Sequence, residues 1–394
     1  MMLRESRYTD SDPIFRIKNL DTGEVIRLDE FIDKYEPEYN SNLKSQYKLE
    51  LPENLVFNSF IKEKKSHFYQ SIHIQAYKKY LTSEIQCLSV SNDSLYVAVG
   101  YSDGEILILD TKTLDVLKKF SDHKNSISNL IFGPDNMLAS CSDDNSIKIY
   151  NLSSERTIFS YNSNDKITDC CFHPTDPSII LFSTENNMIH LLNFQTNIIL
   201  QELSYITPPT AIAFSPDGEL IIVGCKNGFC YVYSYPDLRY ISQFVAGPRA
   251  KSEVPNEKVT SISFVGSNNF LVSTNDSRIR LVSADNFTIV RKYIGHYCKN
   301  GNMKISVSKD ENLFLIPSED NNGVFLWPVN HEKYYKSEAI FHSFMKDRSK
   351  TAEGFTFGKE IKIKAAAFAH NSSISNLFVI VADSYGGISI VVGQ

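Results

Sequence analysis

The sequence predicts an all-β fold, a seven-bladed β-propeller, on two observations. A polar turn followed by a strand of alternating apolar residues recurs along the chain, and the copies begin their strands at Ile106, Ile147, Ile189, Cys230, Ile279, Val324 and Ile388. These copies are 41, 42, 41, 49, 45 and 64 residues apart. A period near forty residues that contains four short strand patterns is typical of propeller blades, which stack to bury faces that a single blade leaves exposed.

The composition favours one large folded ring and argues against several classes of protein. The 394 residues are 42% hydrophobic, which is enough for a sizeable core. The formal net charge of -6 gives no general reason to expect nucleic-acid binding. The charged N-terminus MMLRESRYTDSD lacks the apolar region of a secretory signal, and no apolar run approaches the ~20 residues of a membrane span. We therefore expect a soluble protein of the cytoplasm or nucleus.

The seven cysteines are predicted to be buried core residues in a reducing compartment. They are Cys87, Cys141, Cys170, Cys171, Cys225, Cys230 and Cys298. They include no C-x-x-C pair and no Cys/His cluster with the spacing of a metal site, and most lie in apolar strand patterns. Because Cys170 and Cys171 are adjacent in a predicted strand, we expect their side chains on opposite faces.

Residues 1–70 are predicted to form a small N-terminal extension. Residues 13–31 alternate between apolar and polar on both sides of Asp21-Thr22-Gly23, which predicts a hairpin. The acidic start of LDEFIDKYEPEY and its Pro37 predict a short helix after the hairpin. Residues 40–70 have scattered apolar anchors, and we expect an extended segment laid along the propeller.

Residues 71–394 contain the ring, in which each blade has an inner, a second, a third and an outer strand. The last strand pattern covers residues 388–393, so the seventh blade lacks an outer strand of its own. The segment Ile72–Ala76 alternates like a strand, yet it precedes the first complete blade. We predict that it pairs with the final blade and closes the ring, which removes an exposed edge that would favour aggregation.

Three fragments match the repeat pattern of a known family. AFSPDG at residues 213–218, CSDDNSIKIYN at residues 141–151 and the pair Gly295-His296 resemble WD repeats. Trp327 occupies the position of the name-giving Trp, whereas Leu109, Tyr150, Leu192, Tyr233, Val282 and Val392 lie at or near the other six positions. The resemblance implies a His-Ser/Thr-Asp-Trp hydrogen-bond network, which few blades of this chain can complete. Packing must therefore supply most of the stability.

Residues 210–328 carry a more detailed resemblance. The stretches AIAFSPDGELIIVGCKNGFCYVYSYPDLRYISQF, FLVSTNDSRIRL and KYIGHYCKNGNMKISVSKDENLFLIPSEDNNGVFLW are similar to WD-repeat scaffold proteins that bind small Rab GTPases on recycling endosomes, and to their plant and fungal relatives. The opening RIKNLDTGE resembles a module that precedes the propeller in plant members. The resemblance implies a vesicle-traffic scaffold in the cytoplasm and on endosomes, with a small GTPase among its protein partners.

The longest connections indicate where a partner binds. Ala246–Lys258 and the region 331–360 are read as links from an outer strand to the next inner strand, so we expect both on one face of the ring, where insertions on a rigid scaffold commonly carry binding. The candidate partner-binding residues on that face form a basic rim of Lys226, Arg249, Lys251, Lys258 and Arg278. Such a rim suits an acidic protein surface or a phospholipid headgroup; the alternative is that long solvated loops merely contain Lys and Arg.

The insertion at 331–360 is predicted to include the outer strand of the sixth blade, around Ala339–Phe344. It also holds Phe355 and Phe357 beside Lys and Arg residues. Aromatic residues interleaved with basic ones can stack on nucleic acid. A strand followed by a loop that packs its Phe residues on the ring explains the same pattern, and we prefer that interpretation.

No catalytic or cofactor motif is found in the sequence. G-x-x-x-x-G-K-S/T, G-x-G-x-x-G, G-x-S-x-G and H-E-x-x-H are all missing. The acidic pairs Asp143-Asp144 and Glu319-Asp320 fall on blade turns. His123 and His296 precede inner strands, where hydrogen bonding in the fold is the expected role. The inner strands offer mainly Ser, Thr, Ala and Cys to the central channel, so a propeller enzyme is the least favoured hypothesis.

We therefore predict a non-enzymatic protein-interaction scaffold without cofactor or metal, present as a monomeric ring. The alternative function is a structural subunit of a large cytoskeletal, ciliary or other multiprotein assembly. The sequence leaves open the identity of the partner, the packing of the extension and the oligomeric state.

Overall fold

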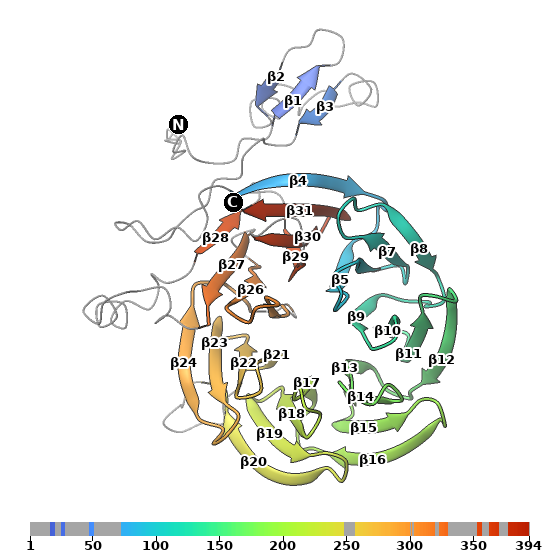
Figure 1. Ribbon diagram of the computed structural model, residues 1–394, viewed down its shortest axis with the longest axis vertical. Helices are drawn as coiled ribbons and strands as arrows, with labels where there is room; N and C mark the ends of the chain where they lie inside the picture. The colour runs from blue at the N-terminus through green and yellow to red at the C-terminus, as the bar shows by residue number, and fades with distance from the viewer. Residues whose placement is uncertain are drawn as a thin grey trace, which may run out of the picture.

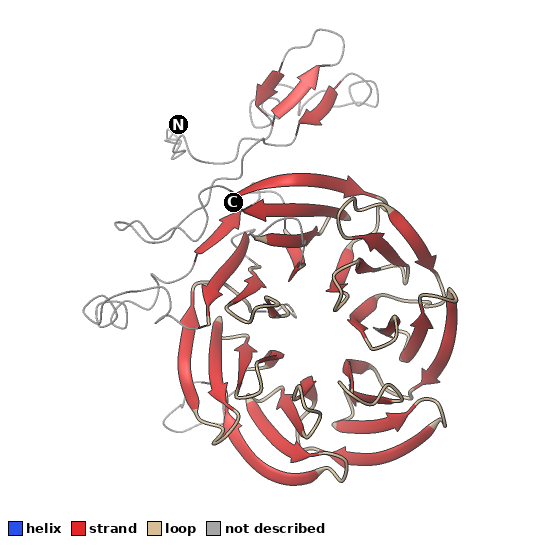
Figure 2. Cartoon of the chain, in the orientation of Figure 1, coloured by secondary structure: helices blue, strands red, loops and turns tan. Residues whose placement is uncertain are grey.

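Seven four-stranded sheets surround a central opening in the computed structural model of the chain (Figure 1), and a separate three-stranded sheet precedes them. The structure describes residues 16–19, 25–27, 47–50, 72–247, 257–299, 301, 303–319, 323–329, 353–356, 362–369 and 377–393. Every regular element in these ranges is a strand (Figure 2). The predicted all-β fold, a seven-bladed propeller, is confirmed.

The blades follow the chain in order. The first is β5 (Ile85–Val90), β6 (Tyr96–Tyr101), β7 (Ile106–Asp110) and β8 (Val116–Phe120). The second is β9 (Ile127–Phe132), β10 (Met137–Ser142), β11 (Ser146–Asn151) and β12 (Arg156–Asn162). The third is β13 (Ile167–Phe172), β14 (Ile179–Thr184), β15 (Met188–Asn193) and β16 (Ile198–Ser204). The fourth is β17 (Pro209–Phe214), β18 (Leu220–Cys225), β19 (Phe229–Ser234) and β20 (Arg239–Val245).

The remaining three blades complete the ring. The fifth is β21 (Val259–Val265), β22 (Asn269–Thr274), β23 (Arg278–Ser283) and β24 (Ile289–Ile294). The sixth is β25 (Ser306–Val307), β26 (Leu313–Pro317), β27 (Gly323–Pro328) and β28 (Glu353–Thr356). The seventh is β29 (Ile363–Phe368), β30 (Phe378–Asp383) and β31 (Gly387–Gly393), with β4 (Ile72–Lys79) on its outer side. The seven repeated patterns are therefore the third strands.

The ring closes through β4, as predicted. This strand lies antiparallel to β31 (Figure 1), with Ala76 opposite Ile390 and Ile74 opposite Val391. A bulge between those two pairs leaves Gln75 exposed. Because the bulge reverses the alternation, Ala76 packs on the core between the seventh and first blades, while Ile74 packs on the core between the sixth and seventh.

The apolar core is divided into seven clusters, one at each interface between neighbouring blades. All seven cysteines are buried and free, which confirms their predicted place in the core. Cys170 belongs to the cluster between the second and third blades, and Cys171 to the cluster between the third and fourth. Their side chains thus lie on opposite faces of β13, because alternate residues of a strand face opposite ways.

The prediction for the sixth outer strand is wrong. Glu353–Thr356, rather than Ala339–Phe344, pairs with β27, and Phe355 lies opposite Val324. Residues 339–344 and Phe357 lie outside the described residues. Residues 339–344 and 353–356 both have strand-like sequences. Which of them forms the outer strand depends on pairing with β27, some thirty residues upstream, and local sequence does not reveal that pairing. The long insertion therefore joins a third strand to an outer strand.

The N-terminal sheet has the order β2-β1-β3, formed by β1 (Arg16–Asn19), β2 (Val25–Arg27) and β3 (Tyr47–Glu50). β1 and β2 pair antiparallel, as expected for the hairpin at 13–31. Residues 47–50 were expected in a segment extended along the propeller, but they pair with β1 instead, with Leu49 opposite Ile17. The helix expected after the hairpin falls outside the described residues.

Candidate functional site

The two faces of the ring carry different connections, because neighbouring strands in a blade run antiparallel. We call the face at which the inner strands begin the upper face. It carries the links from each outer strand to the next inner strand and the turns between second and third strands. The lower face carries the turns between first and second strands and between third and outer strands. Lys226, Lys258 and Arg278 all lie on the upper face of the fourth and fifth blades.

Lys226 is exposed in the turn between β18 and β19. Its backbone N–H donates a hydrogen bond of 2.9 Å to the carbonyl oxygen of Pro208, which lies just before β17. That bond joins the turn of Lys226 to the turn that contains Ile206, whose exposed fraction is 92%. An aliphatic side chain with this exposure leaves apolar surface in water that a partner could cover. Sequence reasoning missed Ile206, although an Ile among the turn residues Thr207, Pro208 and Pro209 was a signal.

Lys258 directly precedes β21 and is half-buried. Burial, followed by the positive charges of Lys304 and Lys226, holds the pKa of Lys258 below its ordinary value. Lys258 therefore carries its positive charge less readily than an exposed lysine.

Arg278 begins β23 and is tied to a carboxylate. Its Nη1 lies 3.1 Å from Asp276 Oδ2, and Arg280 Nη2 lies 2.6 Å from the same oxygen. Burial opposes ionisation of Asp276, but the bonds from Arg280 and Thr274 and the charges of both arginines outweigh it and keep the pKa of this carboxyl low. Part of the charge of Arg278 is thus neutralised. Arg249 and Lys251, the other predicted rim residues, lie outside the described residues.

The strand ends that flank the two long connections lie on opposite faces, contrary to the prediction of one shared face. β20 ends and β21 begins on the upper face. β27 ends and β28 begins on the lower face, because β27 is a third strand and β28 an outer strand. The error follows from the misplaced sixth outer strand, because moving that strand moves the insertion to the other end of the blade.

The central channel contains charged residues that sequence reasoning missed. Lys304 Nζ of the sixth blade lies 3.0 Å from Asp169 Oδ1 of the third blade, so this ion pair spans the channel. Asn129 Nδ2 of the second blade donates to the same oxygen at 2.6 Å, and the backbone N–H of Ile212 in the fourth blade donates to Oδ2 at 3.1 Å. The signal was a single Asp in the inner strand ITDCCF and a single Lys in MKISVS.

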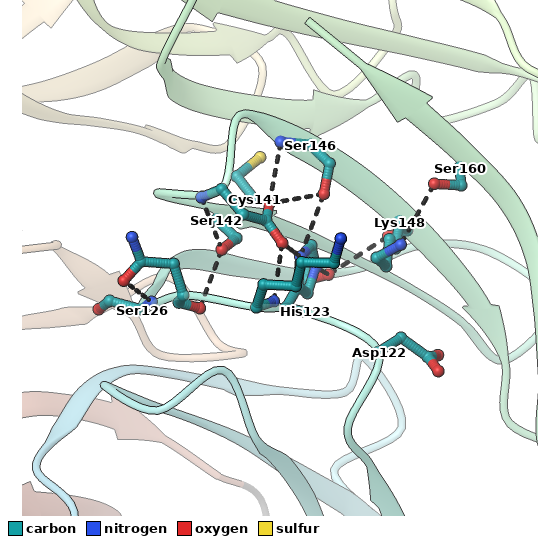
Figure 3. Close-up of polar contacts among 12 residues, drawn as sticks. Asp122, His123, Ser126, Cys141, Ser142, Ser146, Lys148 and Ser160 are labelled. Carbon is teal, nitrogen blue, oxygen red and sulfur yellow. Dashed lines mark hydrogen bonds and ion pairs between the residues drawn. The ribbon is translucent and has the colours of Figure 1, made fainter.

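His123 forms the His-Ser-Asp part of the network expected of a regular repeat, in a blade that has Tyr150 at the Trp position. Its ring Nδ1 lies 2.9 Å from Asp144 Oδ2, and its Nε2 lies 2.6 Å from Ser140 Oγ. Figure 3 shows His123 beside Ser146, whose Oγ lies 3.2 Å from Nδ1. Burial opposes ionisation of Asp144, yet bonds from Ser146, the Lys124 N–H and His123 lower the pKa of Asp144 to about 2. Burial also lowers the pKa of His123. These contacts hold the second blade to the link before it, which is a structural role.

His296 lies buried beside Trp327, with the two ring centroids 6.0 Å apart in an edge-on arrangement. Neither ring nitrogen has a hydrogen-bond partner in the part of the chain that the structure describes. Burial lowers the pKa of His296 to about 4, so the ring is neutral at neutral pH. The carboxylate that the family pattern would supply is Asp320, which lies outside the described residues.

The acidic pairs support the backbone or pair with lysine. Lys166 Nζ lies 2.9 Å from Asp143 Oδ1. Glu319 accepts a hydrogen bond of 2.9 Å from the Lys299 N–H and another from the Gly301 N–H. Within the described ranges, no three His, Cys, Asp or Glu residues come together as a metal site, and no helix could span a membrane.

Comparison with known proteins extends this description. Residues 67–184 match the Vps8 β-propeller family, and residues 204–234 match the WD domain, G-beta repeat family. The chain is 28% identical over 222 residues to an uncharacterized WD repeat-containing protein of Schizosaccharomyces pombe, covering 52% of this chain and 36% of that protein. It is 27% identical over 261 residues to WD repeat-containing protein 44 of Xenopus laevis, covering 65% of this chain and 28% of that protein.

A third relative is a named subunit of a complex. The chain is 22% identical over 167 residues to the target of rapamycin complex subunit LST8 of Saccharomyces cerevisiae, covering 39% of this chain and 52% of that protein. In each of these comparisons the match spans less than two thirds of the relative. Seven four-stranded blades, the contacts of His123 and these repeat matches lead to one conclusion: the chain has the fold of a WD40 β-propeller and is similar to WD-repeat proteins over part of its length.

Proposed function

We propose that this chain is a non-enzymatic scaffold that binds an acidic protein surface on the upper face of its fourth and fifth blades. We further propose a small GTPase of vesicle traffic as the partner class. The resemblance of residues 210–328 to Rab-binding scaffolds supports the second step. A phospholipid headgroup is less suited to this surface for two reasons. Lys258 is half-buried and Arg278 is paired with Asp276, so only part of the positive charge of the rim is available, and the exposed apolar side chain of Ile206 lies in the neighbouring turn.

The observation that carries the proposal is the pair of joined turns that present Ile206 beside Lys226. An exposed aliphatic side chain gains roughly 1.5–3 kcal/mol when a partner buries it fully. A neighbouring exposed cation favours an acidic partner and speeds its encounter. Lys258 and Arg278 contribute less, since one is half-buried and the other shares Asp276.

Affinity purification with and without a non-hydrolysable GTP analogue tests this proposal. The variant Ile206→Asp/Lys226→Glu should recover at least tenfold less of any nucleotide-dependent partner, because it removes the apolar anchor and reverses the exposed charge. The matched control is Ile198→Asp/Lys112→Glu, which makes the same changes at exposed positions on the outer strand of the third blade and a turn of the first. Undiminished capture by the first variant, with both proteins equally stable to heat, would remove the proposed surface.

A structural subunit of a large assembly is the second candidate, and the outside of the ring favours it. Exposed large apolar residues recur on the outer strands of the first five blades: Val116, Leu117, Ile158, Ile198, Leu200, Tyr240, Ile241 and Val290. Neighbours in an assembly would cover such a band. Fractionation separates the two functions, since an adaptor should be extractable and have a GTP-dependent contact, whereas an assembly subunit should stay in large particles at high salt.

A further inference from the structure

A cavity of about 970 Å³ fills the lower half of the central channel. Its walls come from the inner strands of all seven blades, and it reaches the first-to-second turns of the lower face at Ser91, Ser215 and Ser308. Its lining ends, toward the upper face, at the level of Asn129, Asp169 and Lys304. The cavity therefore runs from the lower face to a level that holds Asp169 and Lys304, which we call its charged floor. Its volume falls within the range of ligand pockets.

The floor offers a cation that can take a second partner. The Lys304 side chain is 40% exposed and points its ammonium at the buried carboxylate of Asp169, 3.0 Å away. Asp169 also accepts hydrogen bonds from Asn129 Nδ2 at 2.6 Å and from the N–H groups of Cys170 and Ile212, each at 3.1 Å. An ammonium has three donors, so Lys304 can bind a ligand carboxylate while it keeps its ion pair with Asp169.

Most side chains that line the walls are small, and some are apolar. The fifth residue of the inner strand lines the cavity in the six blades whose inner strand is that long, and five of these six residues are small: Ser89, Cys171, Ala213, Ser263 and Ala367. Their size keeps the channel open. The hydroxyls of Ser89 and Ser263 have no hydrogen-bond partner among the described residues, so they are available to a ligand. Phe172, Phe214, Phe264 and Phe368 line the cavity one residue further along their strands and add aromatic surface.

The charge in the cavity selects the ligand. Its charged lining residues are Asp169, Lys304, Lys309 and Asp310. Asp310 accepts bonds of 2.6 Å from both Ser308 Oγ and Asn312 Nδ2 in its own turn. Both carboxylates are thus occupied, whereas Lys309 is exposed and Lys304, though paired with Asp169, is 40% exposed. A carboxylate deep in the cavity would share the Lys304 ammonium with Asp169, whereas a cation there would have to compete with it.

We propose that this cavity binds the carboxylate-bearing end or side chain of an extended peptide, which enters from the lower face with the carboxylate toward Lys304. The Phe rings bury apolar parts of the peptide, and the serine hydroxyls bond to its backbone. This site is independent of the upper-face surface around Ile206. It would let the ring hold two partners at once, one on each face.

Affinity selection from two synthetic libraries of random heptapeptides, one with free C-terminal carboxylates and one with C-terminal amides, tests the proposal on the full chain. Peptides retained by the wild-type protein should be at least tenfold depleted on Lys304→Met, and the depleted peptides should carry Asp, Glu or a free C-terminus. Depletion confined to the first library identifies a C-terminal carboxylate, and depletion in both identifies an acidic side chain. The matched control, Lys112→Met, changes an exposed lysine outside the cavity and should retain the same peptides.

A second variant guards against loss of folding. Ala213→Leu narrows the cavity wall without touching the ion pair and should deplete the same peptides. If Lys304→Met melts at a much lower temperature than the wild-type protein, peptide depletion on Ala213→Leu alone decides whether the cavity binds these peptides. The proposal is overturned if no retained peptide depends on Lys304 or Ala213, or if the peptides that do depend on them lack a carboxylate.

Discussion

Polar residues buried between the blades replace the missing members of the family network. In the second blade His123 bonds Asp144, which lies in the turn between second and third strands. The fifth blade places Asp276 in the corresponding turn, but there the partner is Arg280 from β23, whose side chain is 1% exposed. Arg280 Nη1 also donates to Thr274 Oγ1 at 2.5 Å. A buried arginine thus does in one blade what a histidine does in another.

Arg280 and Arg278 both bond the carboxylate of Asp276, so substituting each in turn tests whether the buried arginine stabilises the blade. Arg280→Met should lower the free energy of unfolding by roughly 3–5 kcal/mol, because it leaves Asp276 buried without its main partner. Arg278→Met removes a side chain that is 40% exposed and bonds the same carboxylate, and should cost about 0–1 kcal/mol. Urea unfolding of both variants measures the difference. Equal losses would show that Arg280 is no more important than a surface ion pair.

Strand β4 shows how one element decides the integrity of the ring. It supplies the outer strand of the seventh blade from a segment more than 300 residues away from its partner in sequence. Its side chains contribute to two inter-blade cores on either side of one bulge. Without it, the hydrogen-bonding edge of β31 would be open to other chains.

Substitutions at two adjacent residues of β4, one packed on the core and one exposed, test whether ring closure depends on core packing. Ile74→Asp should destabilise the protein by roughly 2–4 kcal/mol, because a charge replaces an aliphatic group packed on the core between the sixth and seventh blades. Gln75→Asp places the same charge at the exposed bulge position and should change stability by less than about 0.5 kcal/mol. Thermal unfolding and light scattering record both effects. If the two variants behaved alike, closure would not depend on the packing of Ile74.

Across the whole molecule, buried histidines couple stability to pH. Burial lowers the pKa of His123, His173 and His296, which belong to different parts of the ring. Below pH 6.5 the unfolded chain binds protons at these rings more readily than the folded chain does. Stability is therefore complete above pH 6.5 and is lost as the pH falls toward the folded-state values. Asp144, with its pKa lowered to about 2, loses its contribution at still lower pH.

His296 should dominate this loss. Its pKa of about 4 corresponds to about 3 kcal/mol of stability lost between pH 6.5 and pH 4. His296→Phe should reduce the pH dependence of the free energy of unfolding by that amount, measured by urea unfolding across this range. Met303→Leu alters the same core cluster without removing a titratable group and should leave the slope unchanged. A slope that survives in His296→Phe would assign the effect to other groups.

The sequence by itself determined the number of blades, the identity of their third strands, the closing strand and the burial of the cysteines. Each of these depends on local apolar patterns, which mark a strand whatever its neighbours are. The alternation of residues 72–76 was enough to predict a strand, although it did not show the bulge that places Ile74 and Ala76 in different cores. The apolar residues around Cys170 and Cys171 likewise predicted burial on both faces of their strand.

Only the tertiary structure decided which strand completes the sixth blade, where the long insertion emerges and which side chains meet in the channel. Glu353–Thr356 pairs with β27, whereas the sequence had suggested Ala339–Phe344 for that strand. Because of this pairing, the strand ends that flank the insertion lie on the lower face. Asp169 and Lys304 are 135 residues apart in sequence and meet because the third and sixth blades face each other across the ring. The sum of the blade-to-blade rotations sets such a distance, and no local pattern records that sum.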